Sequence, residues 1–388
     1  MRMSMNAAAR GCLGVMLGSA LVVGCGGQGE NAEQSPSAVG QVERAVTRSV
    51  PMQVTALSGV QKVLAGNSNV FAQTSDGKRW GWGYDYFGQV GAASGSSPGG
   101  YSVPVELQPS LSTTVGFDGG ALHTLFLLND GSVIRRGLDN FGQVGSFSIS
   151  GTAIAAGTLH SVVLKSDGTV WGWGDNRNGQ LGDGTYASPR YAPVQVTGLS
   201  GVTIKAIAAG GDNTYALDSN GDVWAWGSNL GKQLGYVGDF SLVPKKVPAL
   251  SPAKAIVAGA NFVVALKTDG TVWSTGGTNP TWQVMGLPAT ATITSIAAGQ
   301  DFAMAVDSVG SVWSWGINLY GQLGHCTNTD SLTTAVRVAS SCNGGSPTAY
   351  LSNVASVAAA SFSGFAVRGD GTLWSWGYDE GVLGTNNQ

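Results

Sequence analysis

Short apolar runs alternate with turn-forming residues along most of this chain, and the same arrangement recurs seven times. In the clearest copy, the run His160–Leu164 is followed by Ser166-Asp167-Gly168 and then by Thr169–Gly174. Runs rich in β-branched and aromatic residues, bounded by Asp-Gly or Asn-Gly, predict strand, tight turn and strand. Each copy is therefore predicted to contain a β-hairpin.

The spacing inside the repeated unit never changes. Each copy opens at a glycine, or at Ala360 in the seventh copy, and has further glycines eleven and seventeen residues later. The opening glycines are Gly66, Gly120, Gly157, Gly210, Gly259 and Gly299. A unit that recurs every 40 to 60 residues or so, and is too small to bury its own apolar face, is typical of a propeller or a solenoid.

Tryptophans occupy two fixed positions of the unit, two residues apart on the second strand of the hairpin. Alternate residues of a strand share a face, so both rings of a pair lie on one side of the sheet. Eleven of the 12 tryptophans lie at these positions, which favours packing between copies over a sugar-binding aromatic platform. The second copy has Ile134 and Arg136 there, and the fifth has Thr275 at the second position, so these two copies should be the least regular.

An Asn-x-x-Gly-Gln-Leu-Gly segment or a variant of it follows most Trp-Gly pairs, as in Asn176–Gly182. Its Asn and Gln side chains could bind a cation or a sugar. Side chains that satisfy the backbone of a turn are the commoner use, and we favour that role.

The full pattern from Ile154 to Gly182 resembles the RCC1 (regulator of chromosome condensation) repeat. The resemblance extends from residue 50 or so to residue 388, and seven copies match the seven-bladed β-propeller of that family. It implies an all-β fold of four-stranded antiparallel blades around a central channel.

The two ends of the repeat array predict how the ring closes. Pro51–Val60 resembles Pro193–Val202, which is the end of a repeat and not its start, and the chain also stops in the middle of a repeat. Residues 50–60 should therefore supply the outer strand that the last blade lacks. Such a strand would cover an edge that otherwise invites aggregation.

The N-terminal residues differ from the repeats in composition. Residues 1–25 resemble a bacterial lipoprotein signal, with basic residues, a short apolar segment and a lipobox that ends at Cys25; a plain secretory signal is the alternative. Residues 26–48 read as a flexible tether and residues 49–388 as the propeller. We expect an exported protein of the cell envelope, with lipidated Cys25 anchoring it to a membrane, the outer one where there are two.

Two cysteines remain in the predicted propeller, Cys326 and Cys342. In an exported chain this pair predicts a disulfide. The alternative, a metal site, would have only His325 nearby and would lack a fourth ligand.

Composition and motifs narrow the class of function. Charged residues make up 11% of the chain and the net charge is -3, so no basic field is present to hold nucleic acid. His123 and His160 share one repeat position that other copies fill with Asn, Phe or Ser, as a structural position would be filled. Paired carboxylates, a nucleophile elbow and zinc-ligand spacing are absent from the sequence, and we expect neither enzyme activity nor a cofactor.

The RCC1 resemblance would imply guanine-nucleotide exchange on a small nuclear GTPase and chromatin binding. The export signal, the missing basic tail and the invariant spacing of the hairpins argue against that transfer, and exchange activity stays an alternative. Some exported bacterial members inhibit β-lactamases through one rim of the propeller, which is a second alternative.

We expect a monomeric, non-catalytic propeller that binds an unidentified protein of the envelope or extracellular space through rim loops. The variable segments that follow the hairpins, 92–114, 183–199, 236–252 and 325–353, carry aromatic and Arg residues suited to an interface. The candidate partner-binding residues are Tyr101, Tyr186, Arg190, Tyr191, Tyr236, Phe240 and Tyr350.

Overall fold

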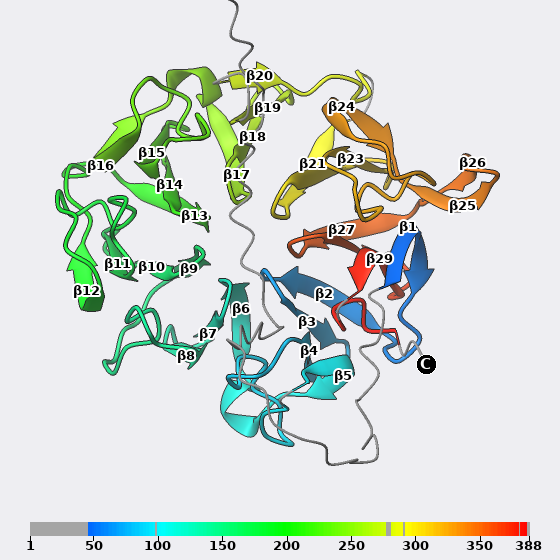
Figure 1. Cartoon of the computed structure of the whole chain (residues 1–388), viewed down its shortest axis with the longest axis horizontal. Helices are drawn as coiled ribbons and strands as arrows, with labels where there is room; N and C mark the ends of the chain where they lie inside the picture. Colours follow the sequence, from blue (N-terminus) through cyan, green and yellow to red (C-terminus); the bar gives the residue numbers. More distant parts are fainter. Residues whose placement is uncertain (1–45, 98, 277–280, 290–291, 380, 386–388) are drawn as a thin grey trace, which may run out of the picture. The chain divides into compact units, whose positions relative to one another are not determined.

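Seven antiparallel sheets are arranged as blades around a common axis (Figure 1). The structure is a computed structural model and describes residues 46–97, 99–276, 281–289, 292–379 and 381–385. Its helices are the single 3₁₀ turns η1 (Pro109–Leu111) and η2 (Pro248–Leu250), and across the described ranges no helix has the length and apolar character needed to cross a bilayer. The predicted all-β, seven-bladed propeller is confirmed.

Each blade is a meander whose first strand lies nearest the axis. Blades 1 to 4 contain β2 (Val60–Ala65), β3 (Asn69–Thr74), β4 (Arg79–Gly83) and β5 (Tyr101–Glu106); β6 (Thr114–Gly119), β7 (His123–Leu128) and β8 (Val133–Gly137); β9 (Ala153–Ala156), β10 (His160–Leu164), β11 (Val170–Gly174) and β12 (Arg190–Gln195); and β13 (Ile204–Gly210), β14 (Asn213–Asp218), β15 (Val223–Ser228) and β16 (Phe240–Lys246).

The remaining strands form blades 5 to 7 and one extra hairpin. They are β17 (Ala253–Ala258), β18 (Val263–Lys267), β19 (Val272–Thr275) and β20 (Thr281–Gln283) in blade 5; β21 (Ile293–Ala298), β22 (Phe302–Asp307), β23 (Val312–Gly316) and β24 (Ser331–Arg337) in blade 6; β27 (Val354–Ala359), β28 (Ser363–Arg368), β29 (Leu373–Asp379) and β1 (Val46–Gln53) in blade 7; and the hairpin β25 (Ala339–Asn343) and β26 (Ser346–Tyr350).

Blades 2 and 5 are the least regular, as the missing tryptophans predicted. Blade 2 has three strands instead of four, and the outer strand of blade 5, β20, is three residues long. The other five blades each have a fourth strand of at least six residues.

The ring closes through β1, which pairs antiparallel with β29 as the outer strand of blade 7 (Figure 1). This confirms that a strand from the start of the propeller completes the last blade. The strand lies earlier than expected, however, from Val46 to Gln53, and residues 54–59 form the connection into blade 1. Strand structure thus begins three residues before the predicted start of the propeller at residue 49.

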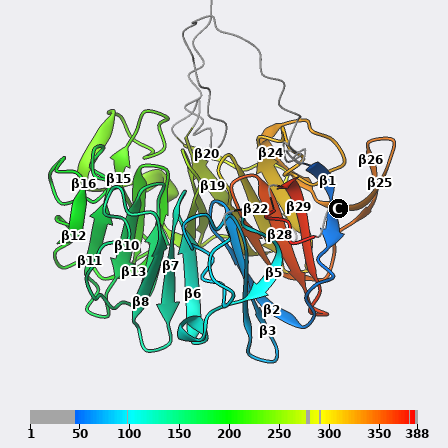
Figure 2. The ribbon, with the colours of Figure 1, turned by 60° about the horizontal axis from the view of Figure 1, so that its bottom comes forward.

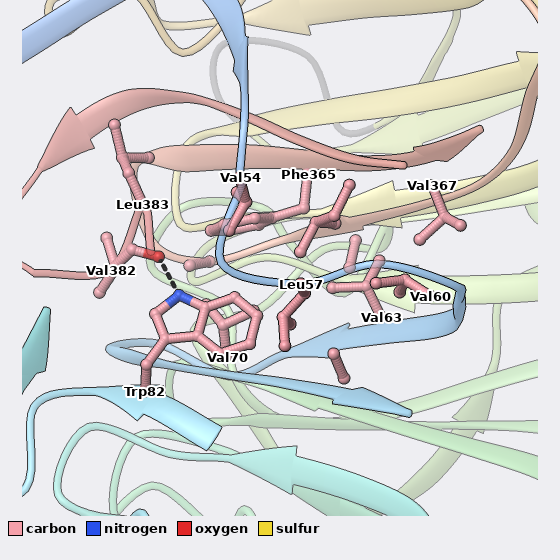
Figure 3. Close-up of a cluster of buried hydrophobic side chains, with 14 residues drawn as sticks. Val54, Leu57, Val60, Val63, Val70, Trp82, Phe365, Val367, Val382 and Leu383 are labelled. Atoms are coloured by element: carbon pink, nitrogen blue, oxygen red, sulfur yellow. Dashed lines mark hydrogen bonds between the residues drawn. The ribbon is translucent and has the colours of Figure 1, made fainter. Parts of the chain in front are cut away.

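The core between blades 7 and 1 repeats a contact found between other blades (Figure 3). The fully buried indole of Trp82 donates a 2.7 Å hydrogen bond from Nε1 to the carbonyl of Val382 in blade 7. Trp173 and Trp226 donate in the same way to the carbonyls of Gln143 and Gln180 in the preceding blades. Burying one large aromatic ring in each interface gives the ring a continuous core, and the hydrogen bond satisfies the indole N–H inside it.

Six copies open at a glycine, and at Gly120 and Gly210 the closeness of the next inner strand requires it. A Cβ built on Gly120 would lie 2.3 Å from the carbonyl oxygen of Gly157 in the next blade, and one on Gly210 would lie 2.0 Å from that of Gly259. Real Cβ atoms do not approach backbone this closely, so any side chain here would push two blades apart.

The hairpin that contains β25 and β26 carries the disulfide and lies at the outside of the ring beside β1 (Figure 1). Cys326 and Cys342 are bonded through their sulfur atoms, with their Cα atoms 5.8 Å apart. Cys326 also donates its backbone N–H to the carbonyl of Ser49 in β1, at 3.1 Å. The predicted pairing therefore joins the loop of blade 6, the extra hairpin and the strand that closes the ring.

Candidate functional site

The loops between the third and fourth strands of the blades lie at one end of the propeller; Figure 2 tilts the ring so that the loops at both ends of the blades can be seen. We call this end the loop rim. The turns between the first and second strands lie at the same end, because their carbonyls accept hydrogen bonds from the starts of the loops. One example is Tyr84 N–H to Ser68 O, at 2.9 Å. The tight Asp-Gly turns lie at the opposite end.

A buried asparagine holds the loop rim in blades 3, 4 and 6. In blade 4, Asn229 accepts the N–H of Leu234 at 2.9 Å through Oδ1 and donates from Nδ2 to the carbonyl of Tyr236 at 2.8 Å. Asn176 and Asn318 make the equivalent bonds to the loops of blades 3 and 6. These asparagines are used to fix backbone, as the sequence predicted.

The glutamine side chains of the same segments accept hydrogen bonds from the backbone of the turn just before them. The Oε1 of Gln180, for example, accepts the N–H of Asn178 at 2.9 Å, and Gln233 does the same for Gly231 at 2.7 Å. Both glutamine side chains are buried. Together, the Asn and the Gln make each loop a rigid platform whose remaining side chains are free to point outward.

Ion pairs tighten the loop of blade 3 further. The buried carboxylate of Asp175 accepts from Arg177 at 2.8 Å and from the hydroxyl of Ser188 at 2.7 Å. Arg190 donates from Nη2 to Asp183 at 2.7 Å. The hydrogen bonds from Arg177 and Ser188 outweigh the effect of burial and hold the pKa of Asp175 below its ordinary value.

Large apolar side chains are exposed on the loop rim of blades 3 and 4. Tyr186 and Phe240 are 49% and 46% exposed, and their rings form an edge-to-face pair across the two blades with centroids 5.4 Å apart. Leu230 and Val237, on the loop of blade 4, are 81% and 99% exposed. We call Tyr186, Leu230, Val237 and Phe240 the rim patch.

The predicted partner-binding residues do not all lie in this patch. Tyr186 and Phe240 do, whereas Arg190 is held by Asp183, and Tyr191 lies on the outer strand β12 against Gly142 of blade 2. Tyr350 lies on the hairpin at the outside of the ring, where the guanidinium of Arg337 is 4.8 Å from its ring centroid.

Tyr101 and Tyr236 are only partly exposed, and their hydroxyls are used inside the fold. The hydroxyl of Tyr101 donates to the carbonyl of Gly95 at 2.5 Å, and that of Tyr236 donates to the carbonyl of Ala225 at 3.0 Å. Burial raises the pKa of Tyr236 to about 12. Cys25, the predicted lipidation site, lies outside the described residues.

Leu230 was not predicted because it lies inside the Asn229–Gly235 turn, which is otherwise structural; its signal was an apolar residue where polar residues are common. Val237 lies in the predicted variable segment 236–252 but was not among the candidate residues, which were aromatic residues and Arg. Sequence reasoning also missed an aromatic cluster at the same end, in which the ring of Tyr320 lies 5.2 Å from that of Phe362 and 4.6 Å from that of Tyr378.

The two buried histidines of the propeller have structural surroundings. His123 Nε2 lies 3.0 Å from the hydroxyl of Ser161, and His160 Nε2 lies 3.0 Å from that of Thr214. Burial, helped by the neighbouring His160, lowers the pKa of His123 to about 3. Burial lowers that of His160 to about 4, so both rings are neutral near pH 7. Within the described ranges, no group of three or more His, Cys, Asp or Glu residues is placed to hold a metal ion.

Comparison with known proteins identifies the repeat. A model of the regulator of chromosome condensation (RCC1) repeat matches residues 167–217 and 220–266, and a second model of this repeat matches 152–180, 204–231 and 293–322.

The RCC1 domain-containing protein RUG3, mitochondrial, of Arabidopsis thaliana is 30% identical over 192 residues, which cover 49% of this chain and 34% of that protein. The E3 ubiquitin-protein ligase HERC2 of Homo sapiens is 27% identical over 215 residues, 55% of this chain and 4% of that protein. The chain thus spans about a third or less of the length of these relatives.

Solved structures show the same fold. Human WBSCR16 superposes with a TM-score of 0.68 at 19% identity, covering 84% of this chain and 89% of that one. Yeast RCC1 (Prp20), solved with Kap60 bound, gives a TM-score of 0.63 at 21% identity, covering 89% and 86%. At these identities the likeness extends to the architecture alone.

Proposed function

Because the chain carries RCC1 repeats folded into a closed propeller, we propose that it is a non-catalytic binding protein that captures another protein through the rim patch. The observation that carries the proposal is the exposed Tyr186–Phe240 pair, with Leu230 and Val237 beside it on loops that the buried asparagines hold rigid. Exposed aromatic residues on a rigid support are the side chains that dominate protein interfaces.

The loop rim is the favoured face because exposed large apolar side chains are unequally divided between the two ends. Among the described residues, six lie on the loops of this rim or directly beside them: Tyr86, Tyr186, Leu230, Val237, Phe240 and Leu319. At the opposite end, Val115, Met285 and Val309 are of this kind within the described ranges. Apolar side chains gathered in loops mark interaction sites more often than isolated ones do.

Structural relatives support a protein partner in general terms. The yeast protein Prp20 was solved with Kap60 bound, and a second structure of it concerns its binding to Gsp1p and histones. At 18–21% identity these partners are not transferred to this chain. We propose instead an envelope or extracellular partner, because the sequence around Cys25 predicts export and lipid anchoring.

The test is capture of a binding partner by the full chain, compared with variants of the rim patch. Tyr186→Ala and Phe240→Ala should each weaken binding by about 30-fold, which corresponds to roughly 2 kcal/mol for a central aromatic anchor. The control is Val309→Ala, which removes an apolar side chain that is 73% exposed at the opposite end and should leave the affinity unchanged. Equal loss in the control, or full binding by Tyr186→Ala/Phe240→Ala, would reject the rim patch as the interface.

A further inference from the structure

In the part of the chain that the structure describes, blade 2 has no outer strand, unlike every other blade. Its sheet ends at β8, Val133–Gly137. Among the described residues, only the start of β8 has a neighbour on its outer side, where Val133 N–H donates to the carbonyl of Ile149 at 3.1 Å and Ser132 bridges to Ser150. The rest of β8 is a strand edge.

The backbone groups on this edge belong to Arg135 and Gly137. Along an antiparallel strand the N–H and C=O of one residue point to one side, and those of the next residue point to the other. Val133 bonds outward, so Arg135 and Gly137 also face outward. In blade 3 the corresponding residues, Gly172 and Gly174, pair with Val194 and Arg190 of the outer strand. For Arg135 and Gly137, the described part of the chain provides no such pairing partner.

A cleft of about 410 Å³ lies beside this edge, between the loop of blade 1 and blade 2. It is lined by Asp85, Gly95 and Gln108 of blade 1 and by Arg135, Arg136 and Val144 of blade 2, among others. Arg136 stands at the repeat position that the buried indole fills in Trp82, Trp173 and Trp226. The cleft therefore lies at an interface that lacks the usual tryptophan ring.

One arginine donor at the cleft has no hydrogen-bond partner in the described part of the chain. Arg136 donates to Gln108 Oε1 at 2.9 Å, while its Nε is buried and has no partner among the described residues. Arg135 lies on the other face of β8, where Nη2 donates to the carbonyl of Phe147 and the guanidinium is 4.1 Å from the centroid of the Phe147 ring.

The carboxylate of Asp85, which also lines the cleft, is bonded to backbone. Its two oxygens accept the backbone N–H groups of Val90 and Ser97, at 2.7 and 3.0 Å. Burial raises the pKa of Asp85. On the cleft side of β8, the donor without a hydrogen-bond partner among the described residues is therefore Nε of Arg136.

The fold already accepts an outer strand that is not continuous with its blade. β1 lies more than three hundred residues before β29 in the chain, yet it completes blade 7. An extended segment can therefore occupy the fourth-strand position without belonging to the blade. Strand addition of this kind takes its affinity from main-chain hydrogen bonds and its specificity from alternate side chains.

We propose that this edge and cleft bind an extended acidic segment of a partner protein, which adds to β8 as the fourth strand of blade 2. Its backbone pairs with Arg135 and Gly137, and a Glu or Asp side chain on the cleft side pairs with the free Nε donor of Arg136. The site is separate from the rim patch of blades 3 and 4 and does not depend on it.

The test uses the full chain and a labelled hexapeptide, acetyl-Thr-Glu-Val-Glu-Val-Thr-amide, chosen for its extended preference and alternating charge. Binding is followed by fluorescence anisotropy, and backbone protection by amide hydrogen exchange. On binding, exchange at the amides of Arg135 and Gly137 should slow by about tenfold or more. The peptide with Gln in place of both Glu residues should bind about tenfold or more weakly, as expected for loss of a charge-assisted pair.

Variants separate the backbone and side-chain contributions. Arg135→Pro removes an outward N–H without touching the bonds to β7 and should abolish binding, whereas Arg135→Lys keeps the N–H and the charge and should retain it. Arg136→Gln should weaken binding about tenfold, while Arg177→Gln, the matched control on blade 3, should have no effect.

Three results would overturn the proposal: no binding at about 1 mM peptide, equal affinity for the Glu and Gln peptides, or amides of Arg135 and Gly137 that are already protected without peptide. The last would show that another part of this chain covers the edge. The hydrogen-exchange readout uses the unaltered protein, so the proposal stays testable even where a variant fails to fold.

Discussion

The stability of the ring should depend on pH through His160, which is buried between blades 3 and 4. The hydroxyl of Thr214 donates to the carbonyl of Gln180 at 2.7 Å, so its oxygen accepts from His160 Nε2, and the ring is neutral. Burial lowers the pKa of His160 to about 4. A base with a lowered folded pKa contributes stability above its unfolded pKa and loses it as the pH falls.

The size of this effect follows from proton uptake by the unfolded chain. Between about pH 8 and about pH 5, an unfolded histidine with a pKa of ~6.5 becomes protonated while the folded one does not, which costs about 2 kcal/mol of unfolding free energy. The figure depends little on the folded pKa, provided that it lies below 5 or so. His123, with a pKa of about 3, should contribute a similar amount between blades 2 and 3.

The perturbation is the double variant His160→Phe/Thr214→Ala, which copies a pair that the chain already uses. Phe262 and Ala303 stand at the same repeat positions in blades 5 and 6. Unfolding free energies are measured by urea unfolding followed by tryptophan fluorescence. From about pH 8 to about pH 5, the unfolding free energy of the variant should fall by about 2 kcal/mol less than that of the unaltered protein.

Comparing the variant with the unaltered protein cancels the contributions of the other titrating groups to the pH dependence of stability. Burial raises the pKa of Asp118 to about 7, so Asp118 destabilises the fold increasingly as the pH rises, the opposite sign to histidine. Because Asp118 is present in both proteins, its effect cancels in the difference. Thr214→Ala alone keeps the imidazole and should keep the pH dependence. Equal losses in the double variant and the unaltered protein would refute the reasoning.

Four further predictions concern closure, covalent links and processing. Deleting Val46–Gln53 should lower the unfolding free energy by about 3 kcal/mol or more, because the main-chain bonds to β29 are lost, and a truncated protein that unfolds like the intact one would contradict the role of β1. Trp82→Phe leaves a buried carbonyl unpaired and should lower the unfolding free energy, measured with urea, by about 1–3 kcal/mol. Trp80→Phe, whose half-buried indole donates to a hydroxyl and not to a backbone carbonyl, should lower it by under about 1 kcal/mol. Changing Cys326 and Cys342 to serine should lower the unfolding free energy by roughly 3 kcal/mol in the chain-entropy model. Free thiols in oxidised protein would exclude the bond. Mass spectrometry of the mature protein should find lipidated Cys25 at its N-terminus; an uncut chain would reject the predicted processing.

The sequence predicted the fold because the constraints that build it recur at fixed spacing. The opening glycines are fixed by the approach of adjacent inner strands, and the second tryptophans by the interface between blades, so both appear as a period in the sequence. The matching of residues 51–60 to the end of a repeat predicted the closing strand for the same reason.

The interaction surface was harder to predict because a variable segment runs from one end of a blade to the other. Residues 183–199 include part of the rim loop, the outer strand β12 and the connection to blade 4, so Tyr186 lies on the rim and Tyr191 on the outer strand. Sequence spacing cannot separate these parts. The exposure of Leu230 and Val237 depends on how the loop folds over Asn229, which is a tertiary property.

One position of the rim loop combines a constant backbone with a changing side chain. It directly follows the residue whose Asn or Asp side chain accepts loop N–H groups, and it is filled by Tyr86, Asn140, Arg177, Leu230 and Leu319 in blades 1, 2, 3, 4 and 6. All five side chains are exposed, so replacing one leaves the core between blades unchanged. A rigid ring with such a position in five of its blades can change the chemistry of its rim while the buried contacts between blades stay the same. Substitutions at this position can therefore change partner contacts with little effect on the packing of the ring. This applies to the apolar residues at this position and to the nearby Tyr186–Phe240 pair.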